Sequence, residues 1–192
     1  MHESEPVAME GEGEEEPRVI SASLTGADRR RYTGSVPQQI LATFVEAVRQ
    51  VFQDTDIAIT SVEPGDALGY GAQVITSVGL TGDVRGILMI RTDTAGAASI
   101  LRAMSGGVRL QITSDRLSEM EMAAIGEISN QIAGRAITLL ADRDLHCDIT
   151  PPTVIAAPQL QSLVPDLGES FHQTISGPFG RLTVFLGISR LR

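Results

Sequence analysis

Two polar side chains that lie three residues apart, Glu127 and Asn130, have the types and the spacing to do chemistry together. A helix places residues at this spacing side by side on one face. A carboxylate can pair with a cation, and an amide oxygen can accept a hydrogen bond without titrating. Ala123 precedes Glu127 by one turn, and Gly134 follows Asn130 by one turn. These small residues leave room for another surface to approach the pair.

The pair also has a plainer interpretation, because polar residues on a helix usually face solvent. Gly134 adds a second question, since a glycine in a helix interior costs roughly 1 kcal/mol relative to alanine. Either a neighbouring element packs closely against it, or a partner approaches closely there. The sequence leaves both explanations open.

The element that must position the pair is a helix predicted over residues 117–143. Ser118 is expected to cap its start, with Glu121 completing a capping box. Glu119 and Glu121 suit the positive end of the helix dipole, and Arg143 suits the negative end. One face is apolar and is expected to pack into the core: Met122, Ile125, Ile128, Ile132, Ala136 and Leu139. The opposite face carries Ala123, Glu127, Asn130, Gln131 and Gly134.

Three longer segments accompany the pair: VGLTGDVRG over residues 78–86, GEISNQIAGRA over 126–136 and DITPPTV over 148–154. Together they resemble the CheC/CheX/FliY family of bacterial chemotaxis phosphatases. Within that family, the single-site CheX type fits best. The resemblance covers about residues 36–188, which is nearly all of the chain after its first segment.

The resemblance implies a hydrolase that removes the aspartyl phosphate from a CheY-like receiver domain of a response regulator. It implies that Asn130 positions the attacking water and that Glu127 anchors the partner by pairing with a lysine of the receiver. Ala123, Gln131 and Gly134 would contact the partner. The enzyme is expected to have no cofactor of its own, because the receiver supplies Mg²⁺. The resemblance also makes a homodimer the expected assembly.

Two positions depart from the family pattern. The family often has Asp or Ser four residues before the glutamate, where this chain has Ala123. A family proline falls here on Thr153, directly after Pro151 and Pro152. The alternatives are therefore a non-catalytic receiver-binding or scaffold module of the same fold, and a dimeric interaction domain whose Glu127 face contacts an unrelated partner.

An earlier amphipathic helix is predicted over residues 37–53, with Pro37 in its first turn and apolar residues at helical spacing. In the two-site CheC branch of the family, the equivalent helix carries a second acid–amide pair. Here Glu46 is followed at that spacing by Arg49, which is not an amide. A second phosphatase site is therefore not expected.

The remaining segments are predicted mostly as strands, because apolar and polar residues alternate in them and turn residues separate them. A short strand is predicted over residues 57–62, followed by a turn over 63–67. Two hairpins resemble one another and follow a helix each: residues 72–80 with 84–91, and 170–176 with 181–188. A helix is expected over residues 94–104, capped by Asp93 and ended by Gly106 and Gly107. A further strand is expected over residues 153–157. The predicted class is a two-layer α+β or α/β fold: a largely antiparallel sheet with two long helices on one face, pseudo-duplicated and CheC/CheX-like.

Composition and charge set the remaining expectations. Seven glutamates lie in the first 17 residues, so residues 1–35 are predicted to be a disordered acidic tail and linker, and residues 36–192 one CheX-like phosphatase domain. The net charge of −9 argues against a nucleic-acid partner. Without a signal-peptide pattern or a run of about 18 apolar residues, no membrane association is expected. The single Cys147 fits a cytoplasmic location, and three scattered histidines do not predict a metal site.

Overall fold

The structure of the protein is a computed structural model that describes residues 36–65, 73–105, 116–157, 160 and 169–191. The helices in these ranges are α1 (Val36–Asp54), α2 (Thr94–Met104) and α3 (Glu119–Ala141). The strands are β1 (Ser61–Pro64), β2 (Val74–Gly82), β3 (Val84–Thr92), β4 (Cys147–Ile149), β5 (Thr153–Ala156), β6 (Glu169–Gly177) and β7 (Gly180–Leu191). The predicted acidic tail and the glycine pair after α2 lie outside the described residues.

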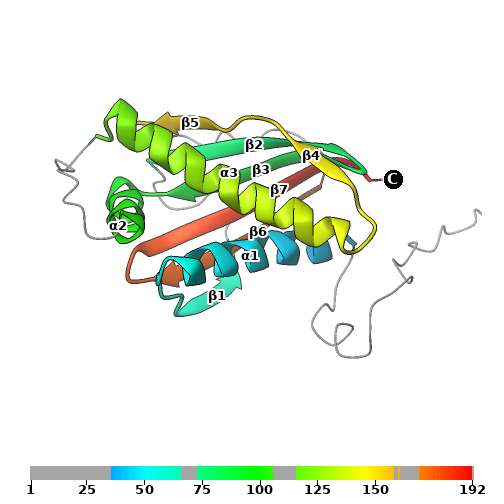
Figure 1. The fold of residues 1–192 in the computed structure, drawn as a ribbon, viewed down its shortest axis with the longest axis horizontal. Helices are drawn as coiled ribbons and strands as arrows, with labels where there is room; N and C mark the ends of the chain where they lie inside the picture. The colour runs from blue at the N-terminus through cyan, green and yellow to red at the C-terminus, as the bar shows by residue number, and fades with distance from the viewer. Residues whose placement is uncertain (1–35, 66–72, 106–115, 158–159, 161–168, 192) are drawn as a thin grey trace, which may run out of the picture.

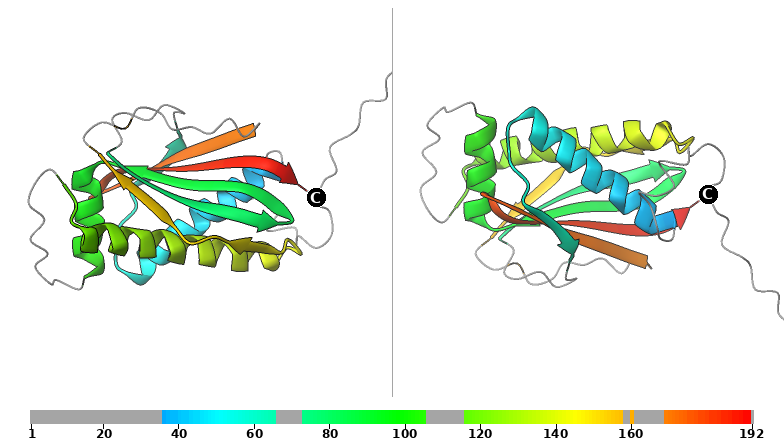
Figure 2. Two further views of the ribbon diagram at one scale, coloured as in Figure 1. Left: turned by 90° about the horizontal axis from the view of Figure 1, so that it is seen from above. Right: turned by 90° about the horizontal axis from the view of Figure 1, so that it is seen from below.

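The strands form one sheet in the order β1-β6-β7-β3-β2-β4, with β5 also paired to β2. Every pairing in it is antiparallel. Helices α1 and α3 cross one face of this sheet, and α2 lies at one end (Figure 1). The side views place α1 and α3 on the same side of the strands (Figure 2). The predicted fold, a largely antiparallel sheet with two long helices on one face, is confirmed.

The sheet is built from two similar halves that exchange strands. The first half runs α1–β1–β2–β3, and the second runs α3–β4–β5–β6–β7. The two hairpins meet where β3 pairs with β7. Strand β1 of the first half pairs with β6 of the second, and β5 of the second pairs with β2 of the first. This exchange agrees with the duplication expected from the two hairpins.

Side chains cap the N-terminal ends of α2 and α3, as predicted. Ser118 Oγ accepts a hydrogen bond from the Glu121 amide at 3.3 Å, and Glu121 Oε2 accepts one from the Ser118 amide at 2.7 Å. Asp93 caps α2 by accepting from the Gly96 amide at 2.6 Å. The role expected for Arg143 is wrong, because α3 ends at Ala141 and the Arg143 guanidinium instead donates to Thr43 Oγ1 of α1 at 2.8 Å.

The core between the helices and the sheet is largely aliphatic, with Phe44 and Phe52 of α1 fully buried in it. On α3, four of the six predicted inward residues are buried: Ile125, Ile128, Ile132 and Ala136. Met122 and Leu139 are half-buried, whereas Leu140 is completely buried. Leu140 is buried because α3 contacts α1 and α2 as well as the sheet, so the buried part of its surface extends beyond the predicted apolar face.

Two parts of the strand prediction were wrong. The first strand begins at Ser61 instead of residue 57, and it includes Glu63 and Pro64, which were expected in a turn. Its pairing with distant β6 decides these limits, and an edge strand tolerates proline. Strand β4 was not predicted at all, and it exists because residues 147–149 pair with the end of β2.

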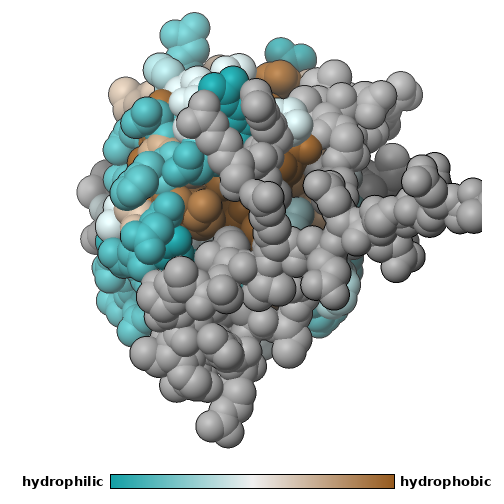
Figure 3. All heavy atoms as spheres, turned by 90° about the vertical axis from the view of Figure 1, so that its right-hand side faces the viewer, coloured by the Kyte–Doolittle hydropathy of each residue, from teal (hydrophilic) through white to brown (hydrophobic). Residues whose placement is uncertain are grey.

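The molecular surface is mixed in character. In the view of Figure 3, hydrophobic residues are visible in the middle and hydrophilic residues gather to their left. Within the described ranges, none of the helices combines the length and the apolar character that crossing a bilayer requires.

Candidate functional site

The five predicted site residues lie together on the solvent side of α3, which we call the α3 ridge: Ala123, Glu127, Asn130, Gln131 and Gly134. Ala123, Glu127 and Gln131 are exposed, and Asn130 and Gly134 are half-buried. Residues three apart on a helix have Cβ atoms about 5–6 Å apart. The carboxylate and the amide can therefore both reach one partner surface.

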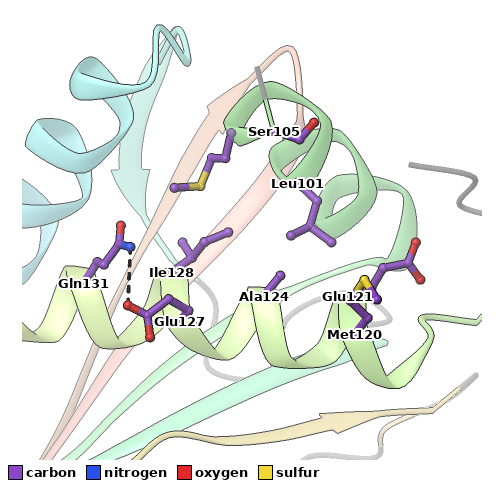
Figure 4. A pocket seen from close by; sticks show the side chains of 9 residues that line it. Leu101, Ser105, Met120, Glu121, Ala124, Glu127, Ile128 and Gln131 are labelled. Carbon is purple, nitrogen blue, oxygen red and sulfur yellow. Dashed lines mark hydrogen bonds between the residues drawn. The ribbon is translucent and has the colours of Figure 1, made fainter. Parts of the chain in front are cut away.

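The Glu127 carboxylate is available to a partner. Gln131 Nε2 donates to Glu127 Oε1 at 3.4 Å, a long contact that Figure 4 shows as a dashed line. No arginine in the described part of the chain forms an ion pair with Glu127. An exposed carboxylate without a cationic neighbour is free to pair with a basic residue of another protein.

The Asn130 amide is also uncommitted, because no described residue forms a hydrogen bond with its side chain. One turn before it, Gly126 brings α3 close to the segment that contains β5. A Cβ atom at Gly126 would lie 3.2 Å from Val154 Cγ2 and 3.6 Å from Pro152 Cγ. The proline segment that was noted in the sequence therefore packs directly against the helix next to the pair.

The structure tests one of the two explanations for Gly134, close packing by a neighbouring element. A Cβ atom at Gly134 would meet no described atom within 4 Å, so no described neighbour requires a glycine there. The residue instead borders an open pocket of about 270 Å³ between α1 and α3. Close packing by a described neighbour therefore does not explain this glycine, and the approach of a partner stays a prediction.

Two contacts hold the ridge in place from beneath and from the side. Ser129 is buried and shares a hydrogen bond of 2.6 Å with Thr76 of β2. Arg135 forms an ion pair of 3.0 Å with Asp54 of α1. Sequence reasoning missed Ser129, although a serine next to Ile128 on the inward side of a helix is a signal for a buried hydrogen bond.

Helix α1 repeats part of this arrangement. Gln50 Nε2 donates to Glu46 Oε1 at 3.3 Å, as Gln131 does to Glu127 on α3. The position that corresponds to Asn130 holds the exposed Arg49. The absence of a second phosphatase site thus stays a prediction, and it rests on that arginine.

Other chemistry is poorly supported in the described residues. No group of three or more His, Cys, Asp or Glu side chains there is placed to hold a metal ion. Burial raises the pKa of the Cys147 thiol, and the charges of Asp83 and Asp148 raise it further, against a lowering hydrogen bond to the backbone of Val84. A raised pKa disfavours the thiolate, so Cys147 lacks the activation of a nucleophile.

Fold and ridge together define a class of protein: a duplicated two-layer α+β protein with one acid–amide pair on its long central helix. The family described as "Chemotaxis phosphatase CheX" matches residues 74–176, which is more than half of the chain and includes Glu127 and Asn130. The chain belongs to the CheX family.

Individual relatives agree with this assignment. The chain is 34% identical over 88 residues to the "CheY-P phosphatase CheX" of Thermotoga maritima, and the match covers 46% of this chain and 54% of that protein. The chain thus matches about half the length of this relative.

Solved structures share the fold. The CheX structure from Vibrio vulnificus has a TM-score of 0.67 at 20% identity, covering 81% of this chain and 99% of that one. A CheC-like protein from Shewanella has a TM-score of 0.68 at 17% identity, covering 81% and 99%. CheX from Borrelia burgdorferi, solved as a complex with CheY, BeF3 and Mg²⁺, has a TM-score of 0.64 at 24% identity, covering 79% and 98%.

Proposed function

We propose that this protein hydrolyses the aspartyl phosphate of a CheY-like receiver domain, with Asn130 positioning the water and Glu127 anchoring the partner. The observation that carries the proposal is the geometry of the α3 ridge. It presents on one face an exposed carboxylate with a single long hydrogen bond from Gln131 and an amide that no described residue bonds, beside a glycine with no described atom above it.

The reaction requires little covalent chemistry from the enzyme. The water oxygen forms a bond to phosphorus, and the bond between phosphorus and the aspartyl oxygen breaks, with its electron pair remaining on the receiver's carboxylate. The water protons leave with the phosphate product. Catalysis of phosphoryl transfer rests on positioning and charge stabilisation, and Mg²⁺ held by the receiver would offset charge on the phosphoryl oxygens.

Asn130 suits the positioning role. Its carbonyl oxygen accepts a hydrogen bond from the water and does not titrate, so its function does not change across the physiological pH range. Since no described residue bonds to this amide, the side chain can turn toward the phosphoryl group of a docked partner.

Glu127 suits the anchoring role. A basic residue of the receiver can pair with its exposed carboxylate, and the contact becomes desolvated once the two proteins meet. A carboxylate engaged in this ion pair is a poor general base, so Glu127 acts by binding and orientation.

The names of the relatives support the same function. The Thermotoga maritima protein is a CheY-P phosphatase, and the Borrelia burgdorferi structure contains CheY with BeF3 and Mg²⁺. The homodimer, the cytoplasmic location and the identity of the receiver remain predictions.

The decisive experiment follows the decay of phosphorylated receiver domains from the same genome, with catalytic amounts of the wild type, Asn130→Ala or Glu127→Ala. We expect Asn130→Ala to lower kcat at least about 100-fold while binding is spared, because a mispositioned nucleophile costs that much. Glu127→Ala should raise the Kd for the receiver about 10-fold or more, because the basic residue loses its partner.

The scaffold alternative predicts another result. A non-catalytic module would bind a receiver without accelerating decay, and the non-polar Ala123 on the ridge is the observation that favours it. Equal decay rates with the wild type and with Asn130→Ala would exclude the proposed catalytic role. Unchanged affinity of Glu127→Ala would exclude the proposed anchor.

A further inference from the structure

A groove between α2 and α3 opens directly beside Glu127. Its volume is about 310 Å³, and Figure 4 shows side chains of the two helices pointing into it from opposite sides. The groove is lined by five apolar residues, Leu101, Met104, Met120, Ala124 and Ile128, and by four polar ones, Ser105, Glu121, Glu127 and Gln131. We call it the α2–α3 groove.

The floor of the groove is rigid, and one residue at its mouth is unusually exposed. Leu101 and Ile128 belong to the buried core, so their positions are fixed by packing. Met120, in contrast, is 78% exposed, the most exposed large hydrophobic side chain of the described residues. Exposed apolar surface that is bordered by polar residues is typical of interaction sites, and methionine adapts its shape to a partner.

The two carboxylates at the rim differ in availability. Glu121 accepts hydrogen bonds from the amide and the hydroxyl of Ser118 at 2.7 and 2.9 Å and is buried, so the capping box engages it. Glu127 is exposed and has only the long contact with Gln131. An apolar groove with one available negative charge complements a partner surface that presents an apolar side chain next to a basic one.

We infer that the α2–α3 groove receives an apolar side chain of the receiver domain, adjacent to the basic residue that pairs with Glu127. This inference rests on the proposed function. It gives the complex two attachment points, the groove and Glu127 itself. Asn130 lies one turn after Gly126, the glycine that packs against the β5 segment. Binding energy collected away from the phosphate thereby orients the partner so that its phosphoryl group faces Asn130.

The test fills the groove without touching the acid–amide pair. Ala124 is half-buried on the groove wall, and Ala124→Leu places a larger side chain in the space. We expect KM for the phosphorylated receiver to rise about 10-fold, the size of effect that loss of a central apolar contact produces. The value of kcat should fall far less than in Asn130→Ala, because bound receiver still meets the amide.

Two further variants make the result specific. Ala141→Leu introduces the same side chain at the exposed last residue of α3 and should leave KM at the wild-type value. Met120→Gln removes apolar character from an exposed residue with little effect on folding, and it should raise KM in the same direction as Ala124→Leu. Thermal unfolding of all variants shows that each remains folded.

The possible outcomes separate the inference from the function. If the wild type is an active phosphatase and Ala124→Leu has the same KM, the groove does not bind the receiver. The inference is then wrong, and the proposed function is unaffected. Altered self-association of Ala124→Leu in sedimentation, with unchanged receiver affinity, would assign the groove to a contact between copies and overturn the inference. No acceleration by the wild type with any receiver would overturn the proposed function and the inference together.

Discussion

The hydroxyl oxygens of Thr76 and Ser129 lie 2.6 Å apart, and both residues are only 2% exposed. Thr76 belongs to β2 and Ser129 to α3, so this hydrogen bond joins the sheet to the helix. Ser129 directly precedes Asn130 and follows Glu127 by two residues. The bond therefore fixes the rotation of α3 at the point where its outer face carries the acid–amide pair.

We expect Ser129→Ala to lower the free energy of unfolding by about 1–3 kcal/mol, because the Thr76 hydroxyl is then buried without a partner. Thr76→Val should lower the free energy of unfolding less in the Ser129→Ala background than in the wild type, because no buried hydroxyl is then left without a partner. Urea unfolding of the four proteins in this cycle measures the coupling. Thr138→Ala removes a hydroxyl at an exposed position of α3 and serves as the control, with a change within about 0.5 kcal/mol. Strictly additive losses would contradict the coupling.

Gly134→Ala should change stability and activity in opposite directions. No described atom obstructs the added methyl group, so we expect the free energy of unfolding to rise by up to about 1 kcal/mol through helix propensity. The same methyl group would stand between α3 and a docked receiver and raise KM. Urea unfolding and steady-state dephosphorylation measure the two effects. A more stable variant with wild-type KM would show that the partner does not approach this glycine closely.

Gly126 and Gly134 lie on the same helix, and an added methyl group should affect stability differently at the two positions. An added Cβ would lie 3.2 Å from Val154 Cγ2, closer than an ordinary contact. We therefore expect Gly126→Ala to stabilise less than Gly134→Ala, and Gly126→Val to lower the free energy of unfolding by about 1–3 kcal/mol through overpacking. The measurement is chemical denaturation of the three variants side by side. Equal gains for alanine at both positions would mean that the β5 segment moves away without cost.

The Cys147 thiol should react slowly in the folded protein. Burial, and then the charges of Asp83 and Asp148, raise its pKa above the ordinary value for cysteine, and a hydrogen bond to the backbone of Val84 only partly opposes this. At a given pH below that pKa, the folded protein thus carries less thiolate than the unfolded chain. The measurement is the rate of iodoacetamide labelling across a pH series, followed by mass spectrometry. The pH at which this rate increases should be higher for the folded protein than for the protein in urea. Coinciding pH profiles would contradict the raised pKa.

Local features of the fold were predictable because they depend on residues within one or two turns. Ser118 and Glu121 define the start of α3 through bonds across three residues. The spacing of apolar residues likewise predicted α1 and α3 along nearly their full lengths. Such interactions form between neighbours in the chain, so the sequence contains them directly.

The strands at the borders of the sheet were less predictable. Strand β1 pairs Ser61 with Ser176, and β4 pairs Cys147 with Gly82. Both pairings join segments from different halves of the chain, and a short strand has little pattern of its own. The residues at which these strands begin and end depend on the partner strand, which lies far away in the sequence and leaves no local pattern.

The sequence by itself determined that Glu127 and Asn130 share one exposed face of a long helix, because helical periodicity and a local cap decide it. Only the tertiary structure decided what surrounds them: the open space over Gly134, the hydrogen bond of Ser129 to Thr76 and the groove between α2 and α3. Each of these depends on how close α1, α2 and β2 come to α3. Those distances result from the packing of side chains that are far apart in the chain, and no local spacing encodes them.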